Sequence, residues 1–263
     1  MATHSLPAHA SVMGSTGPMT LAIDIGGTGL KASVLDAEGG KVVDRVRSKT
    51  PYPCPPRVLI RELDKLTYKL PPWDRVSVGF PGFVRAGRVL NAPNLWTKRG
   101  PGTRVSRKLV HAWAGFPLAA ELQARLGKPT RLSNDADMHG LAVISGEGLE
   151  LVLTLGTGLG TAVFLDGAPT PHLELALMPF EGQGTFQDQL GNSARRRVGN
   201  RRWSRRVLTA VEMFDALLHI DRLYVGGGNA KKVDVDLGHR AEMVDNAAGI
   251  LGGIKLWELD RVG

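Results

Sequence analysis

The sequence is poor in cysteine, and this scarcity excludes two common sources of stability. Its 263 residues contain one cysteine, Cys54, and seven histidines. One thiol cannot form a disulfide within the chain, and it cannot supply a zinc site by itself. Because the histidines show no ligand spacing either, we expect no zinc.

Long apolar runs are also missing, and residues 1–20 are not expected to be a secretory leader. No stretch approaches the roughly 18 apolar residues that a membrane helix requires. Residues 1–20 lack a basic start followed by an apolar core, and we expect them to form a disordered tail. Hydrophobic residues make up 43% of the chain and charged residues 22%, which excludes a disordered or fibrous protein. We therefore expect a folded cytoplasmic protein without a membrane partner.

Excess positive charge is confined to one segment. The net charge is +8, but residues 195–206 (RRRVGNRRWSRR) hold seven arginines and no acid, so the rest of the chain is nearly neutral. If a helix begins near Asn200, four of these arginines crowd its first turns, where the helix dipole disfavours cations. They are Arg201, Arg202, Arg205 and Arg206. A bound polyanion would relieve this repulsion, whereas the commoner alternative is a solvated helix face or an interface rim.

Two hairpins with glycine- and threonine-rich turns are predicted. Strands at 21–25 and 31–35 flank the first turn, and strands at 150–155 and 161–165 flank the second. A third glycine run follows a predicted strand at 223–225. Glycine lets backbone N–H groups approach phosphate oxygens, and a threonine hydroxyl adds a donor. The candidate phosphate-binding residues are Gly26, Gly27, Thr28, Gly156, Thr157, Gly158, Gly226, Gly227 and Gly228.

The remaining periodicity predicts alternating helices and strands. Strands are expected near 42–46, 75–79 and 131–132, and helices at 58–66, 118–126, 136–145 and 243–256. A further helix follows Asn200, with His219 near its apolar face in a structural role. Its expected buried positions are Trp203, Val207, Ala210, Val211, Phe214 and Leu217. No P-loop or dinucleotide-binding glycine motif is present, which counts against both of those enzyme classes.

Four motifs, in this order and spacing, resemble the sugar kinases of the ROK family. They are DIGGTGLK, NDAD, TLGTGLGTAVFLDG and YVGGGNA. The resemblance implies an α/β protein with the actin-like ATPase (ribonuclease H-like) fold, in which two lobes surround a central cleft. We expect a small lobe from residues 21–132 plus about 245–263 and a large lobe from residues 133–244.

Other segments look like the polyphosphate glucokinase branch of this family. They are GFPGFVRAGRVLNAPNLW, HLELALMPF, TFQDQLG and GNRRWSRRV. This resemblance implies Mg²⁺-dependent transfer of the terminal phosphoryl group of polyphosphate, or of ATP, to the 6-hydroxyl of glucose. It also implies a homodimer. Many ROK proteins bind zinc through a cysteine-rich loop, and this branch lacks that loop.

The family motifs suggest roles for individual residues. Asp135, in a predicted strand-to-helix turn, matches the catalytic base, and its alternative role is a helix N-cap. Asp24 is expected to hold Mg²⁺ through water, or else to cap the first turn. Gly82, Asn134 and Glu174 resemble sugar-pocket positions. The run Gly226–Gly228 matches the segment that abuts adenosine in ATP-using relatives.

The chain departs from the family at two positions. Leu177 stands where the family usually has a sugar-contacting histidine, and Gln187 falls where a second sugar-binding glutamate is expected. These changes favour a weak or retuned kinase and leave a degenerate sugar-binding regulator as the alternative. A nucleic-acid-binding role for the arginines is less favoured, because Trp203 is the only aromatic residue near them and no nucleic-acid motif is present. We therefore expect no nucleic-acid partner.

Overall fold

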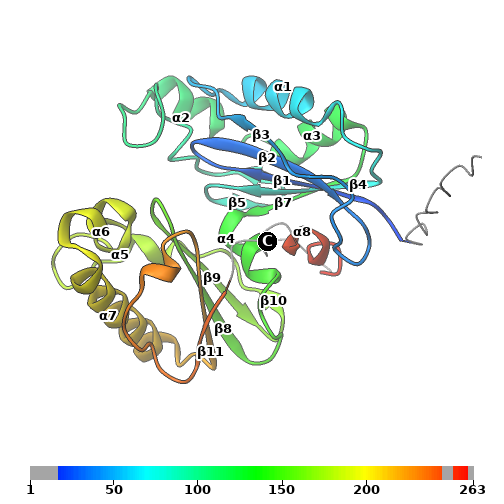
Figure 1. Ribbon diagram of the computed structural model, residues 1–263. Helices are drawn as coiled ribbons and strands as arrows, with labels where there is room; N and C mark the ends of the chain where they lie inside the picture. The colour runs from blue at the N-terminus through cyan, green and yellow to red at the C-terminus, as the bar shows by residue number, and fades with distance from the viewer. Residues whose placement is uncertain (1–16, 245–250, 260–263) are drawn as a thin grey trace, which may run out of the picture.

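Two five-stranded sheets organise the protein. The computed structural model describes residues 17–244 and 251–259. The strand orders are β3-β2-β1-β4-β7 and β10-β9-β8-β11-β12. Figure 1 shows the sheets in two lobes, with helices α4 and α8 between them.

The first sheet is built from the N-terminal half of the chain. It contains β1 (Thr20–Ile25), β2 (Gly29–Leu35), β3 (Val46–Lys49), β4 (Arg75–Phe80) and β7 (Thr130–Asn134). β1 is antiparallel to β2 and parallel to β4. One face packs on α1 (Pro56–Thr67), α2 (Arg107–Trp113) and α3 (Leu118–Leu126). The short hairpin of β5 (Val84–Arg85) and β6 (Arg88–Val89) follows β4.

The second sheet has a similar plan. It contains β8 (Leu149–Leu155), β9 (Leu159–Leu165), β10 (Ala168–Pro169), β11 (Arg222–Gly226) and β12 (Ala241–Met243). One face packs on helices that include α5 (Phe186–Leu190) and α7 (Asn200–Leu218), with α6 (Asn192–Val198) between them. Two short 3₁₀ helices complete this part, η1 (Leu175–Leu177) and η2 (Ala230–Lys232).

Helix α4 (Asp135–Leu141) connects the two sheets and packs against both. Small residues make this close packing possible. A Cβ on Gly140 would lie 2.5 Å from the ring of Phe164, and one on Gly79 would lie 2.7 Å from the end of Met138. Helix α8 (Gly252–Lys255) packs beside α4 and against β1 and β4.

Several predicted elements differ from those observed. The third strand forms at Val46–Lys49 rather than near 42–46, and α4 ends at Leu141 rather than at 145. Met243 belongs to a strand, and residues 245–250 lie outside the described residues. Within the described part of the helix predicted over 243–256, Gly252–Lys255 is helical. Gly252 and Gly253 are the first two residues of α8, and their lack of a side chain allows close contact with α4 and the first sheet.

The helix α7 begins at Asn200 as expected, but two residues predicted on or near its apolar face, Leu217 and His219, do not lie there. Leu217 is 57% exposed, because it lies in the last turn, beyond the buried face. His219 is exposed and ends the helix in the left-handed conformation, with a φ of 51°. It is a C-terminal cap rather than part of the apolar face.

The lobe boundaries proposed from sequence stay a prediction, and the tail and C-terminus assigned to them lie partly outside the described residues. No helix within the described ranges is both long and apolar enough to cross a bilayer.

Candidate active site

Asp24 lies near the end of β1, beside the first glycine turn. Lys31 of β2 places its Nζ 2.6 Å from Asp24 Oδ2, and both side chains are partly exposed. Within the described part of the chain, no three His, Cys, Asp or Glu side chains form a metal-binding group. Mg²⁺ usually keeps several waters and is held by one or two carboxylates plus substrate phosphates. A single carboxylate such as Asp24 fits this mode of binding.

The first glycine turn, residues 26–28, is fixed by hydrogen bonds to its carbonyl groups. The Gly26 carbonyl accepts a hydrogen bond from Thr50 Oγ1 at 2.6 Å. The Gly27 carbonyl accepts one from the Tyr52 hydroxyl, also at 2.6 Å. These bonds satisfy oxygens that would otherwise repel an anion, while Thr28 remains exposed.

Asp135 is the first residue of α4, directly after β7. The N-cap role falls to Asn134, whose Oδ1 accepts hydrogen bonds from the N–H groups of Ala136 at 2.7 Å and Asp137 at 3.4 Å. The Asn134 amide also donates to the Gly82 carbonyl at 3.0 Å. This buried amide therefore ties the loop after β4 to the start of α4, while the side chain of Asp135 stays exposed.

The carboxyl group of Asp135 is surrounded by protein although water reaches it. Loss of solvation at the lobe junction is the main cause that raises its pKa to about 7, and the negative charge of Asp24 is the next. Asp137 and Glu174 act in the same direction, whereas the Ala136 N–H opposes them. The interaction of Asp24 with Asp135 shows that the fold brings together two acids from separate motifs.

The second glycine turn lies between β8 and β9, next to the start of α4. An added Cβ on Gly160, just after the turn, would lie 3.2 Å from the Ala136 Cβ. The Gly156 carbonyl accepts hydrogen bonds from Asn229 Nδ2 at 3.0 Å and from the Asn192 N–H at 3.1 Å. Thr157 is exposed at the tip of the turn. This turn therefore faces the same junction as Asp135.

The third glycine run adjoins the second turn. Gly226 pairs with Thr154 of β8, and Gly227 has a φ of +93°. A Cβ on Gly227 would lie 2.3 Å from the Leu155 carbonyl oxygen, so only glycine fits. Gly228 follows and is exposed. The two runs, predicted from distant segments, thus form one backbone surface.

Glu174 and Gly82 approach Asp135 from opposite lobes. Glu174 precedes η1, and its charge contributes to the raised pKa of Asp135. A Cβ on Gly82 would lie 2.4 Å from the Asn91 carbonyl oxygen, so this loop needs glycine. Leu177, in η1, is 58% exposed and offers no polar group. Gln187 lies at the second glycine turn, where its Oε1 accepts the Leu159 N–H at 3.2 Å.

One buried pair beside this site, His172 with Asp137, was not predicted from the sequence. His172 Nδ1 lies 3.0 Å from both carboxylate oxygens of Asp137, and both side chains are less than one-tenth exposed. Asp137, the second acid of the NDAD motif, was the one sequence signal for this pair, because a buried carboxylate needs a polar or charged partner. Its partner could not be predicted, since 35 residues separate the two.

The arginine segment surrounds a pocket at the start of α7. Arg202, Arg205 and Arg206 line this pocket of about 260 Å³, together with residues of the 180–183 loop. Arg206 donates to Gln189 Oε1 at 2.6 Å, and burial together with the charges of Arg202 and Arg197 lowers its pKa. Arg201 is exposed on the same helix. The short helix α6 joins this region to the second glycine turn.

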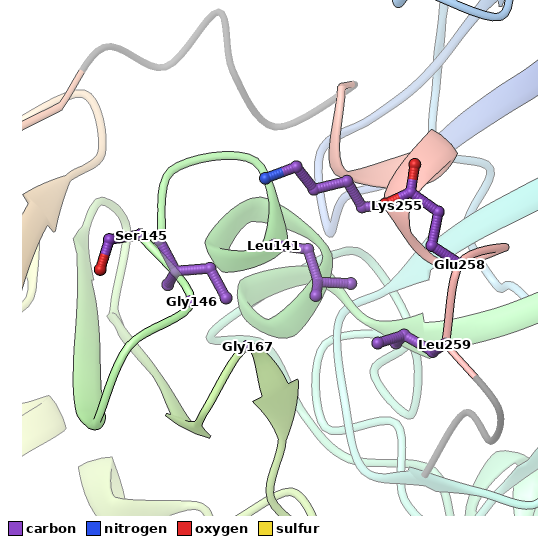
Figure 2. Close-up of a pocket in the computed structure, with 8 residues that line it drawn as sticks. Leu141, Ser145, Gly146, Gly167, Lys255, Glu258 and Leu259 are labelled. Carbon is purple, nitrogen blue, oxygen red and sulfur yellow. The ribbon is translucent and has the colours of Figure 1, made fainter.

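A second pocket, of about 140 Å³, lies at the other end of α4. Figure 2 shows Leu141 between the Ser145–Gly146 turn and the C-terminal segment that carries Glu258 and Leu259. Leu141 is six residues from Asp135, about 9 Å along the helix. None of the predicted site residues lines this pocket.

Comparison with known proteins places this geometry in a family. The model of the ROK family matches residues 20–171. A polyphosphate glucokinase of Mycobacterium tuberculosis is 27% identical over 268 residues, covering 91% of this chain and 96% of the relative.

Solved structures agree with this match. The inorganic polyphosphate/ATP-glucomannokinase of Arthrobacter sp. strain KM has a TM-score of 0.77 at 29% identity, covering 93% of this chain and all (100%) of the other. A ROK family glucokinase from Streptomyces griseus, in complex with glucose and AMPPNP, has a TM-score of 0.70 at 18% identity, covering 90% and 98%, and shows the shared fold. The chain therefore belongs to the ROK family and has its actin-like ATPase fold.

Proposed function

We propose that the protein is a sugar kinase that transfers the terminal phosphoryl group of polyphosphate, or of ATP, to the 6-hydroxyl of glucose. The observation that carries this proposal is the convergence of Asp24, Asp135 and the second glycine turn at the start of α4. The names of the relatives, which include polyphosphate glucokinases and a polyphosphate/ATP-glucomannokinase, support the choice of substrates.

In the proposed reaction Asp135 is the base. Its carboxylate takes the proton of the glucose 6-hydroxyl as that oxygen attacks the terminal phosphorus. The new O–P bond forms, the bond to the next phosphate breaks, and the shortened donor leaves with the electron pair. Glu174 and the loop of Gly82 orient the sugar, and the glycine turns hold the donor. Mg²⁺, held through water by Asp24, would neutralise phosphate charge.

A coupled assay for glucose 6-phosphate tests this proposal, with polyphosphate and ATP compared as donors. We expect Asp135→Asn to lower kcat by about 10²–10⁴-fold, because general base catalysis contributes that much. Circular dichroism and glucose binding should stay at wild-type levels, since Asn keeps the oxygen that accepts the Ala136 N–H. Turnover by this variant at the wild-type rate would contradict the role of Asp135.

We further propose that the four arginines of α7 guide the polyphosphate chain toward the second glycine turn. Changing Arg201, Arg202, Arg205 and Arg206 together to Gln should raise KM for polyphosphate at least tenfold, and KM should lose most of its salt dependence. KM for ATP should change less, because ATP is too short to reach far along the helix.

The matched control removes four cations, three from the exposed face of α1 and one just beyond its C-terminal end. Arg57, Arg61, Lys65 and Lys69 are spaced four residues apart, and all are exposed. Changing them to Gln alters the net charge equally, and KM for polyphosphate should stay close to wild type. An equal effect of both quadruple variants would show that only net charge matters.

The regulator hypothesis has one observation in its favour, the apolar side chain of Leu177 beside Glu174 in sequence. If Leu177 weakens sugar binding, a regulator would still bind glucose and transfer no phosphoryl group from either donor. Calorimetry alongside the coupled assay separates the two functions.

A further inference from the structure

His172 lies at the centre of a buried cluster that the proposed reaction does not use. Its side chain is 5% exposed, and its Nδ1 faces the Asp137 carboxylate. Its Nε2 is buried and finds no hydrogen-bond partner within the described part of the chain, although Glu174 Oε1 lies 3.6 Å away. Because buried polar atoms are almost always hydrogen-bonded, this nitrogen requires an explanation.

The cluster joins segments from both lobes. Asp137 lies on the connecting helix α4, and His172 follows β10. The ring of Phe83, from the loop after β4, meets the imidazole edge-on with 5.3 Å between centroids. Thr161 Oγ1 of β9 donates to the Leu173 carbonyl at 3.2 Å, which anchors the backbone before Glu174. The imidazole is thus contacted by α4 and by the loop after β4, while β9 holds the backbone of the next residue.

The surroundings of His172 favour its charged form. Burial opposes the charge, but hydrogen bonds and charges from Asp137 and Glu174 outweigh this effect and raise the pKa of His172 to about 9. At neutral pH the imidazole therefore also carries a proton on Nε2, which lies 3.6 Å from Glu174 Oε1. A cation between two carboxylates also offsets their mutual repulsion.

We propose that His172 is a positioning residue that holds the Glu174 carboxylate, through Nε2, in the orientation that binds a sugar hydroxyl. This inference rests on the proposed function, which assigns Glu174 to the sugar pocket. His172 does not touch the substrate, because protein atoms cover Nε2. Its effect on the sugar passes through Glu174, and its contact with Asp137 holds the imidazole in place.

Two substitutions separate the functions of the two ring nitrogens. His172→Asn places an amide near the position of Nδ1 and can keep the bond to Asp137 while removing Nε2. We expect it to raise the glucose Kd, measured by calorimetry without a phosphoryl donor, about tenfold. KM for glucose should rise by a similar factor while kcat changes less than threefold. His172→Gln, which can place its amide near Nε2, should recover part of this loss.

A double variant distinguishes positioning from a general structural effect. Glu174→Gln should weaken glucose binding by itself, and adding His172→Asn should weaken it no further. His111→Asn, on the exposed side of α2, is the matched control and should keep the wild-type Kd. A wild-type Kd in His172→Asn, or full additivity with Glu174→Gln, would overturn the positioning role.

A titration covers the case in which both His172 variants unfold. The pKa of His172, measured by NMR, should be lower in Glu174→Gln than in the wild-type protein. An unchanged pKa would overturn the inference. Experiments on the wild-type protein test the proposed function independently of the positioning role. A wild-type protein that binds glucose and transfers no phosphoryl group overturns the kinase proposal and leaves the positioning role intact. A wild-type protein that binds no glucose overturns both.

Discussion

Asp135 combines two properties that seldom occur together in a carboxyl group. Its side chain reaches solvent, yet its pKa is raised to about 7 by loss of solvation and by the charge of Asp24. Asn134 caps α4, so Asp135 does not have to serve as the helix cap, although one of its oxygens also accepts the Ala136 N–H at 2.9 Å. At the residue scale, the site therefore depends on a buried amide as well as on the acid beside it.

The raised pKa predicts a pH dependence of activity. A base must be ionised to accept a proton, so kcat/KM for glucose should fall as the pH drops through about 7. Asp24, Asp137 and Glu174 all act to raise this pKa. A pH–rate profile between pH 5 and 9 measures the midpoint, and an inflection near the ordinary carboxyl pKa of about 4 would contradict the assignment.

The same shift predicts the opposite trend for stability. The folded-state pKa lies above the ordinary value of 3.8, so the folded protein binds a proton that the unfolded chain has released. The contribution of Asp135 to the free energy of unfolding is complete below about pH 4 and is lost as the pH rises through about 7. Asp135→Asn cannot ionise, so it should be more stable than wild type at pH 8.

Urea denaturation of both proteins across this range measures the difference. The stability advantage of Asp135→Asn should shrink toward pH 5. If the stability advantage of Asp135→Asn does not change with pH, ionisation of the Asp135 carboxyl group does not destabilise the folded protein.

At the scale of elements, the glycine runs are places where backbones meet. Gly227 packs against the end of β8, and Gly227→Ala should lower the free energy of unfolding by about 2–4 kcal/mol, from left-handed backbone strain plus overlap with the Leu155 carbonyl. The same change should raise KM for the phosphoryl donor. Chemical denaturation and donor kinetics measure the two effects.

Gly238 provides the control for this prediction. Its φ is also +93°, but an added Cβ would meet nothing within 4 Å. Gly238→Ala should therefore lose only about 1–2 kcal/mol from backbone strain. If Gly227→Ala and Gly238→Ala lose the same free energy of unfolding, the close approach of Gly227 to β8 does not contribute to the destabilisation.

At the scale of the whole molecule, the C-terminal segment returns to the first lobe. The guanidinium groups of Arg75 and Arg131 both lie over the Trp257 ring, 5.2 and 4.7 Å from its centroid. Its Nε1 donates to Ser77 Oγ at 2.8 Å, and Arg131 donates to the Leu256 carbonyl. The segment therefore attaches the end of the chain to the sheet that carries Asp24.

Removing this attachment should destabilise the protein. Trp257→Ala should lower the free energy of unfolding by about 2–3 kcal/mol, because it loses ring packing and both cation–π contacts. Trp257→Phe keeps the ring and loses the bond to Ser77, which should cost about 1 kcal/mol. Urea denaturation measures both losses. If Trp257→Ala and Trp257→Phe lose the same free energy of unfolding, stacking of the ring contributes nothing to stability.

The sequence by itself determined the local elements of this protein. The two hairpins, the bounds of α3 and the buried positions of α7 up to Phe214 were all predicted. Their signals are the apolar period and the steric freedom of glycine, which depend on neighbours in the chain. The motifs were also sufficient to predict the ROK family and its fold.

The tertiary structure alone decided the surroundings of each candidate residue. It paired His172 with Asp137, placed Gln187 at the second glycine turn, exposed Leu217 and put Met243 into a strand. The pKa of Asp135 likewise depends on loss of solvation at the lobe junction and on charges from β1, α4 and the segment before η1. Solvation and Coulomb interactions act through space between distant segments, so local residue spacing does not encode them.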